Sequence, residues 1–182
     1  MVTGISLEEA VARMSAPLSP LGTESLPLEA ALGRTLAADI TAPLDHPPFD
    51  RSPLDGYALR SAHLAGATRD HPAVLEVVDT VYAGDQARIP VKPGEAVRIM
   101  TGAMLPPGCD CVVPQEDTDR GDPVSVFVSL KPFQNYVYQG EDYRKGALLL
   151  GKGTRLDAAA LGVLASAGLT EAEMYCRPRV GL

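Results

Sequence analysis

The strongest constraint on this fold is a motif broken by proline and glycine at residues 47–58, PPFDRSPLDGYA. Proline fixes its own φ, lacks a backbone N–H and restricts the residue before it. We therefore expect a stiff loop here, and neither a helix nor a core strand, with Asp55 held at a fixed place before Gly56. An Asp-Gly pair is also typical of an ordinary hairpin turn, and the residues alone leave that alternative open.

Two more polar loops follow the first. Thr101-Gly102 comes after the apolar run 96–99, and a Gly-Glu-Asp sequence ends at Asp142. Functional side chains are concentrated on loops that a rigid scaffold positions, so the three loops form the candidate functional region. Each also has a plainer interpretation, as a common turn at Thr101-Gly102 or as a solvated acidic loop at 140–142.

Composition excludes several classes of function. The chain has 182 residues, enough for one or two domains, and a formal net charge of −7. Binding to nucleic acid or to an anionic membrane needs a basic face, so neither partner is expected. The longest apolar stretch, 158–168, is about half the length of a membrane helix. Neither the Cys109–Cys111 spacing nor the scattered histidines match a zinc site. We expect a cytoplasmic protein.

Hydrophobic periodicity predicts a helix over residues 6–14, where Ser6 and Glu9 form a capping box. A second helix is predicted at 158–167, capped by Asp157 and closed by Gly168. The remaining expected elements are a short helix at 27–32, an extended segment at 35–40, and strands at 74–78, 96–99, 111–113, 124–128, 147–150 and 171–176.

These elements predict a mixed α+β fold. Residues 1–46 and 140–182 are expected to form an elongated α/β domain, with a small barrel-like all-β domain inserted at 47–139. The predicted helix 6–14 has an apolar face with nothing evident to cover it, and 177–182 begins what resembles another strand. We therefore expect the chain to be the N-terminal part of a longer protein.

Taken together and in order, four motifs resemble the N-terminal half of the molybdopterin molybdenumtransferase family, which includes MoeA and the E domain of gephyrin. The motifs lie at 47–58, 97–103, 107–113 with Glu116 after it, and 140–142. The resemblance covers essentially the whole chain. Each motif is short, but their order and spacing together are highly specific.

The resemblance implies an activity and an assembly. Members insert molybdenum, supplied as molybdate, into adenylylated molybdopterin and release AMP, and they require magnesium. The chain would be the linker domain and inserted β domain of a homodimeric transferase, supplying one wall of a composite active site. Helix 6–14 would pack on a third, pterin-binding domain, and molybdopterin adenylyltransferase would act upstream. The 182-residue chain alone is expected to be inactive.

The resemblance also carries over to individual residues. Three match family positions implicated in activity: Asp55, Thr101 and Asp142. Three more are expected ligand contacts: Ser52, Gly102 and Glu116. The carboxylates of Asp55 and Asp142 are suited to hold a hydrated magnesium ion, which prefers oxygen ligands. The Thr101 hydroxyl and the N–H groups of this turn are suited to bond an anionic oxygen.

Two alternatives remain. The chain could be a non-catalytic dimerisation or scaffold module of the same family, in which these loops are only rigid turns. It could also be a ligand-binding β domain unrelated to molybdenum, although the ordered set of motifs argues against this. Tolerance of Asp55→Ala and Asp142→Ala in cofactor synthesis would favour the scaffold.

Overall fold

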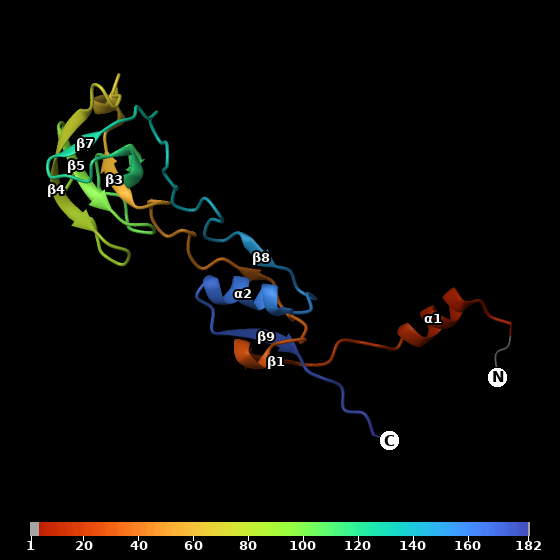
Figure 1. The fold of residues 1–182 in the computed structure, drawn as a ribbon. Helices are drawn as coiled ribbons and strands as arrows, with labels where there is room; N and C mark the ends of the chain where they lie inside the picture. Colours follow the sequence, from red (N-terminus) through yellow and green to blue (C-terminus); the bar gives the residue numbers. More distant parts are fainter. Residues whose placement is uncertain (1–3, 182) are drawn as a thin grey trace. The chain divides into compact units, whose positions relative to one another are not determined.

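The computed structural model describes residues 4–181, which form two compact units (Figure 1). One unit is residues 44–146, and the other combines residues up to Pro43 with those from Ala147 onward. Within the unit of residues 44–146, the His46 N–H donates to the carbonyl of Tyr143 at 2.8 Å, and the expected domain boundaries at 46 and 140 stay a prediction. The fold class is mixed α+β, with few helices and a curled sheet, as predicted.

The discontinuous unit contains two short antiparallel sheets. They pair β1 (Thr23–Pro27) with β9 (Glu171–Tyr175), and β2 (Ile40–Thr41) with β8 (Leu148–Leu150). Leucine and methionine side chains fill the core beside them, with Leu36, Leu164 and Met174 fully buried. The strands β8 and β9 were predicted. β1 was not, because its sequence, TESLP, has no apolar alternation.

Both α-helices begin where their caps predict. In α1 (Leu7–Ser15) the Ser6 hydroxyl accepts the Glu9 N–H at 3.2 Å, and in α2 (Ala158–Ser166) the Asp157 carboxylate accepts the Ala160 N–H at 2.8 Å. All nine residues of α1 are at least partly exposed. No helix within residues 4–181 is long and apolar enough to cross a membrane.

The helix predicted at 27–32 is only a single 3₁₀ turn, η1 (Leu28–Ala30). Six residues are too few to offset the cost of helix nucleation. The Leu28 N–H instead donates to the carbonyl of Thr170 at 3.0 Å, and Gly33 ends the segment in the left-handed region at φ +72°.

The unit of residues 44–146 is built on a five-stranded sheet that curls strongly (Figure 1). Its order is β6 (Cys111–Pro114), β3 (Gly56–Leu59), β5 (Glu95–Ile99), β4 (Ala73–Val81) and β7 (Val124–Val126). Only the β4–β5 pair is parallel. Apolar clusters cover both faces of the sheet, and two 3₁₀ turns, η2 (Ser61–Leu64) and η3 (Gln115–Asp117), complete the unit.

The prediction that residues 47–58 contain no core strand was wrong at their C-terminal end. Gly56 begins β3, a central strand whose four residues are all buried, so Asp55-Gly56 is not a hairpin turn. A Cβ atom on Gly56 would lie 1.9 Å from the carbonyl oxygen of Val113. Glycine is therefore what allows β3 and β6 to approach so closely.

Candidate functional site

Asp55 and Thr101 lie together at one end of the curled sheet. Asp55 directly precedes β3 and Thr101 follows β5, and these strands are antiparallel neighbours with Gly56 opposite Ile99. The residues before one strand therefore meet those after the other. Oδ1 of Asp55 accepts hydrogen bonds from the Thr101 N–H at 2.8 Å and from the Thr101 hydroxyl at 2.7 Å.

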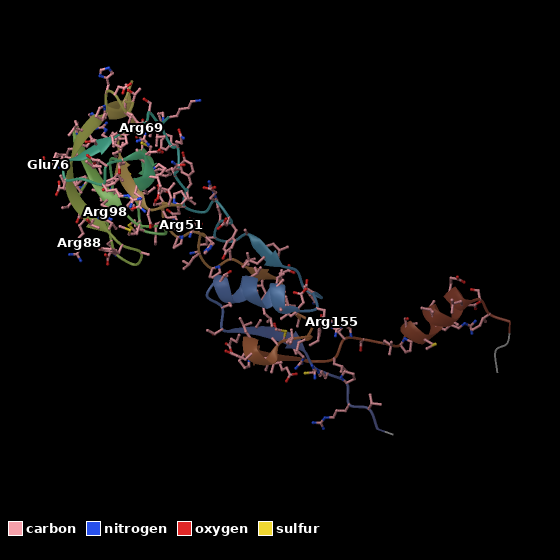
Figure 2. The ribbon with its side chains drawn as sticks, in the orientation of Figure 1. Arg51, Arg69, Glu76, Arg88, Arg98 and Arg155 are labelled. Carbon is pink, nitrogen blue, oxygen red and sulfur yellow. The ribbon has the colours of Figure 1, made fainter. Side chains whose placement is uncertain are left out.

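These bonds favour the ionised form of Asp55. The pKa of its carboxyl is lowered, chiefly by the backbone N–H of Thr101 and then by the Thr101 hydroxyl. Arg98, which extends from β5 opposite Tyr57, adds a smaller effect through its positive charge (Figure 2). Oδ2 of Asp55 accepts no hydrogen bond from residues 4–181. An ionised carboxylate is thus held through one oxygen, and the other is available to a ligand.

The donors of the Thr101-Gly102 turn point inward, and the anionic oxygen that Thr101 bonds is the carboxylate of Asp55; a ligand contact by this turn stays a prediction. The N–H and hydroxyl of Thr101 are used by Asp55, and the N–H of Gly102 donates to the carbonyl of Ser52 at 2.8 Å. Gly102 takes φ +81°, which turns the chain back so that the Ser52 N–H reaches the Ala103 carbonyl at 3.0 Å. Thr101 and Gly102 position the acid and the loop that carries it.

The hydroxyl of Ser52 is likewise turned inward. The residue is 1% exposed, and its Oγ donates to the carbonyl of Leu54 at 2.6 Å and accepts the Leu54 N–H at 3.3 Å. The two bonds occupy this hydroxyl, and a ligand contact by Ser52 stays a prediction. Ser52 shapes the turn ahead of Asp55, as serine often does by bonding its own backbone.

Glu116 remains open to solvent. It lies in η3, and its side chain is 65% exposed and 3.7 Å from Arg120. The preceding residue, Gln115, donates its N–H to the carbonyl of Asp55 at 3.1 Å, which places η3 beside the acid. A ligand contact by Glu116 stays a prediction.

Asp142 lies on a second, exposed turn. Its N–H donates to the carbonyl of His46 at 3.0 Å, and its Oδ2 is 3.7 Å from Nε2 of His46. The His46 ring stacks on Tyr143 with centroids 5.2 Å apart. No hydrogen bond or ion pair within residues 4–181 joins Asp142 directly to Asp55. Among the three predicted residues, direct hydrogen bonds join Asp55 to Thr101, whereas Asp142 lies on the neighbouring turn.

The loop ahead of β3 connects the two turns. On one side Arg51 exchanges backbone hydrogen bonds with Val137, at 2.9 and 3.1 Å. On the other the carbonyl of Asp50 accepts the Leu105 N–H at 2.9 Å. The carboxylate of Asp50 also accepts the Tyr136 hydroxyl at 2.5 Å. Sequence reasoning missed Asp50, although it is an acidic residue in the same motif as Asp55.

A polar cavity of about 270 Å³ adjoins the Thr101 turn. It is bordered by the end of β4 and the loop after it, and its lining residues are Asp79, Thr80, Val81, Asp85, Gln86 and Arg88. The N–H of Met100 donates to the carbonyl of Val81 at 3.1 Å, which joins this wall to the turn. The cavity offers both hydrogen-bond donors and acceptors next to the candidate site.

The carboxylates of Asp55 and Asp142 fit magnesium only as part of a binding site. No group of three His, Cys, Asp or Glu residues placed to hold a metal occurs in the described part of the chain. Magnesium usually keeps several waters and binds through one or two carboxylates together with substrate phosphates. Asp55, with one free oxygen, and the exposed Asp142 match that pattern without forming a complete site.

The family model described as the MoeA N-terminal region (domain I and II) matches residues 5–168. The molybdopterin molybdenumtransferase of Bacillus subtilis is 42% identical over 185 residues, and that of Staphylococcus epidermidis is 35% identical over 181 residues. Each comparison covers 99% of this chain and 43% of the relative, so this chain spans less than half of either relative's length.

Solved structures give the same relationship. The molybdopterin biosynthesis MoeA protein of Pyrococcus horikoshii OT3 has a TM-score of 0.88 at 36% identity, over 94% of this chain and 46% of that chain. A second structure of the Pyrococcus protein gives 0.84 at 35% identity, over 96% of this chain and 45% of that chain. The resemblance noted in the motifs is thereby confirmed: the chain belongs to the family of the MoeA N-terminal region, domains I and II.

Proposed function

We propose that this protein is a molybdopterin molybdenumtransferase, which inserts molybdenum from molybdate into adenylylated molybdopterin and releases AMP. The observation that carries the proposal is the ionised Asp55 carboxylate, held by Thr101 through one oxygen in a member of the MoeA N-terminal family. The Bacillus subtilis and Staphylococcus epidermidis relatives are named molybdopterin molybdenumtransferases.

Asp55, Thr101 and Asp142 have separate roles in the proposed reaction. Asp55 and Asp142 would hold a hydrated magnesium ion, which when bound neutralises negative charge on the phosphates of the substrate. Thr101 fixes the orientation of Asp55 and lowers the pKa of its carboxyl. Glu116 is retained as an exposed ligand contact beside Asp55.

The proposed enzyme works as a homodimer, with this unit forming one wall of a composite site. The helix α1 packs on a third domain, since Leu7, Val11 and Met14 expose 75%, 54% and 73% of their surface. Light scattering over a dilution series tests the dimer.

Molybdopterin adenylyltransferase supplies the substrate, and the three free thiols support a cytoplasmic location.

The proposal predicts that the 182-residue chain alone does not insert molybdenum, because the pterin-binding wall lies outside it. AMP release from adenylylated molybdopterin by this chain alone would contradict that.

Replacing the two carboxylates in the intact gene product tests the function. Asp55→Asn and Asp142→Asn each remove one charge at constant size, and we expect AMP release and molybdenum incorporation to fall about 100-fold. Asp119→Asn is the matched control, because one oxygen of Asp119, like one oxygen of Asp55, accepts two hydrogen bonds, but Asp119 lies in the turn before β7. Unchanged cofactor synthesis in both site variants would instead support the scaffold function.

A further inference from the structure

Asp50 lies in the loop ahead of β3, and its side chain reaches the turn that bears Asp142. Its carboxylate accepts the Tyr136 hydroxyl on Oδ2, and Oδ1 accepts the Gln139 N–H at 2.7 Å. Both oxygens are therefore used. Hydrogen bonds to an ionised acceptor are about twice as strong as those between neutral groups.

The same residue is tied to the Thr101 side of the site. The Asp50 carbonyl accepts the Leu105 N–H at 2.9 Å, four residues after Thr101. Five residues after Asp50 the loop reaches Asp55. Asp50 thus contacts both turns that carry the predicted site residues, one through its backbone and the other through its side chain.

The donor from Tyr136 is fixed in place and stays protonated. Its ring packs against Phe133, with centroids 5.5 Å apart at 85°, and against Tyr138, with centroids 4.9 Å apart. Burial raises the pKa of the Tyr136 hydroxyl, and the neighbouring Asp50 carboxylate raises it further. The hydroxyl therefore remains a donor throughout the physiological pH range.

The turn that Asp50 holds is otherwise exposed. Tyr138, Gln139, Glu141 and Asp142 all face solvent. The turn is bonded internally by the Tyr138 N–H, which donates to Oε2 of Glu141 at 2.9 Å. At its centre it joins the loop ahead of β3 through the Gly140 N–H, which donates to the carbonyl of Pro47 at 2.9 Å, and at its two ends through the backbone bonds of Val137 with Arg51 and of Tyr143 with His46. A turn with few buried contacts opens easily unless a strong bond holds it.

We propose that Asp50 is a positioning residue, which fixes the turn bearing Asp142 relative to the loop bearing Asp55. The role concerns this chain's own geometry, and only its effect on activity rests on the proposed function. Two carboxylates that share one hydrated cation must keep a fixed separation, and a displacement of about 1 Å can cost a site about 100-fold in rate.

Three variants of the intact gene product test the role. Asp50→Asn removes the charge, Tyr136→Phe removes one donor but keeps the ring, and Asp119→Asn is the matched control in the turn before β7. Hydrogen exchange by mass spectrometry is the first readout. We expect exchange at residues 136–143 to rise about ten-fold in Asp50→Asn and less in Tyr136→Phe, with residues 56–59 unchanged.

The second readout is the magnesium concentration that gives half-maximal AMP release. We expect Asp50→Asn to raise this half-maximal magnesium concentration about ten-fold and to lower the rate at saturating magnesium by a smaller factor. Asp119→Asn should leave the half-maximal concentration unchanged. Tyr136→Phe is the milder variant if Asp50→Asn does not fold. Unchanged exchange at 136–143, or increased exchange with normal magnesium dependence, overturns the role. An inactive wild-type protein would instead contradict the proposed function, and exchange would still decide whether Asp50 holds the turn.

Discussion

Thr101 donates two hydrogen bonds to one carboxylate oxygen of Asp55, from its N–H at 2.8 Å and from its hydroxyl at 2.7 Å. The residues are 46 positions apart in the sequence, and the pairing of β3 with β5 brings them together. Any substitution other than proline keeps the backbone donor, whereas the hydroxyl can be removed alone. The two contributions to the state of Asp55 can therefore be separated by experiment.

We expect Thr101→Val to raise the pKa of Asp55, because a donor to the charged form is lost. The pKa should stay below its ordinary value near 3.8, since the backbone N–H remains. Carboxyl-carbon NMR titration measures this directly. Thr101→Ser keeps the hydroxyl and is the control, and an unchanged pKa in Thr101→Val would show that the hydroxyl bond is not made.

Asp119 should contribute to stability at neutral pH and lose that contribution in acid. Its pKa is lowered by hydrogen bonding from Ser125 and then from Gly121. A carboxyl whose pKa is lowered in the folded state stabilises the protein fully at pH values above its unfolded pKa, near 3.8. That stabilisation is lost as the pH falls through the pKa of the folded state. In urea unfolding, Asp119→Asn should have a smaller free energy of unfolding than wild type at neutral pH. The two proteins should be equally stable at pH values below both the folded and the unfolded pKa of Asp119. A pH-independent difference would contradict this linkage.

Gly56→Ala should destabilise the unit of residues 44–146 by about 3 kcal/mol, the upper end of typical overpacking costs. The added Cβ would lie 1.9 Å from the Val113 carbonyl oxygen, which belongs to the paired strand and cannot move alone. Gly162→Ala is the opposite case, because no atom lies within 4 Å and α2 should gain about 0.5–1 kcal/mol. Thermal unfolding of both variants provides the comparison, and equal stabilities would contradict the close approach.

Cys109 and Cys111 should resist alkylation in the folded protein. Burial raises the pKa of each thiol to about 12, and the charge of Asp110 adds to the effect, so little reactive thiolate forms. At mildly alkaline pH we expect iodoacetamide to modify Cys176 alone, with the other two reacting after unfolding. Mass spectrometry of Cys176→Ser, which should remain unmodified, is the check.

Local signals predicted the two α-helices well. Ser6 and Asp157 cap α1 and α2 through residues only three positions away, so the information lies within one turn of sequence. The strands β4 to β7 were predicted in the same way, from short apolar runs between turn residues. The family could also be recognised, because it rests on the order of motifs rather than on their geometry.

The loops were predicted less well. The motif at 47–58 was taken as a loop throughout, yet Gly56 begins a buried central strand. The N–H of Gly102 donates to the carbonyl of Ser52, a bond that was not predicted. In both cases a partner distant in sequence decides the outcome, and no residue near the position indicates which partner it will be.

The sequence alone determined the helix caps, most of the strands, the mixed α+β class and the family. Tertiary structure decided that Asp55 meets Thr101, that Ser52 and Gly102 bond to each other, and that Asp50 holds the turn bearing Asp142. The physical reason is that caps and apolar periodicity depend on neighbours within one turn or strand. Loop hydrogen bonds are instead fixed by the register of paired strands, which only the folded chain sets.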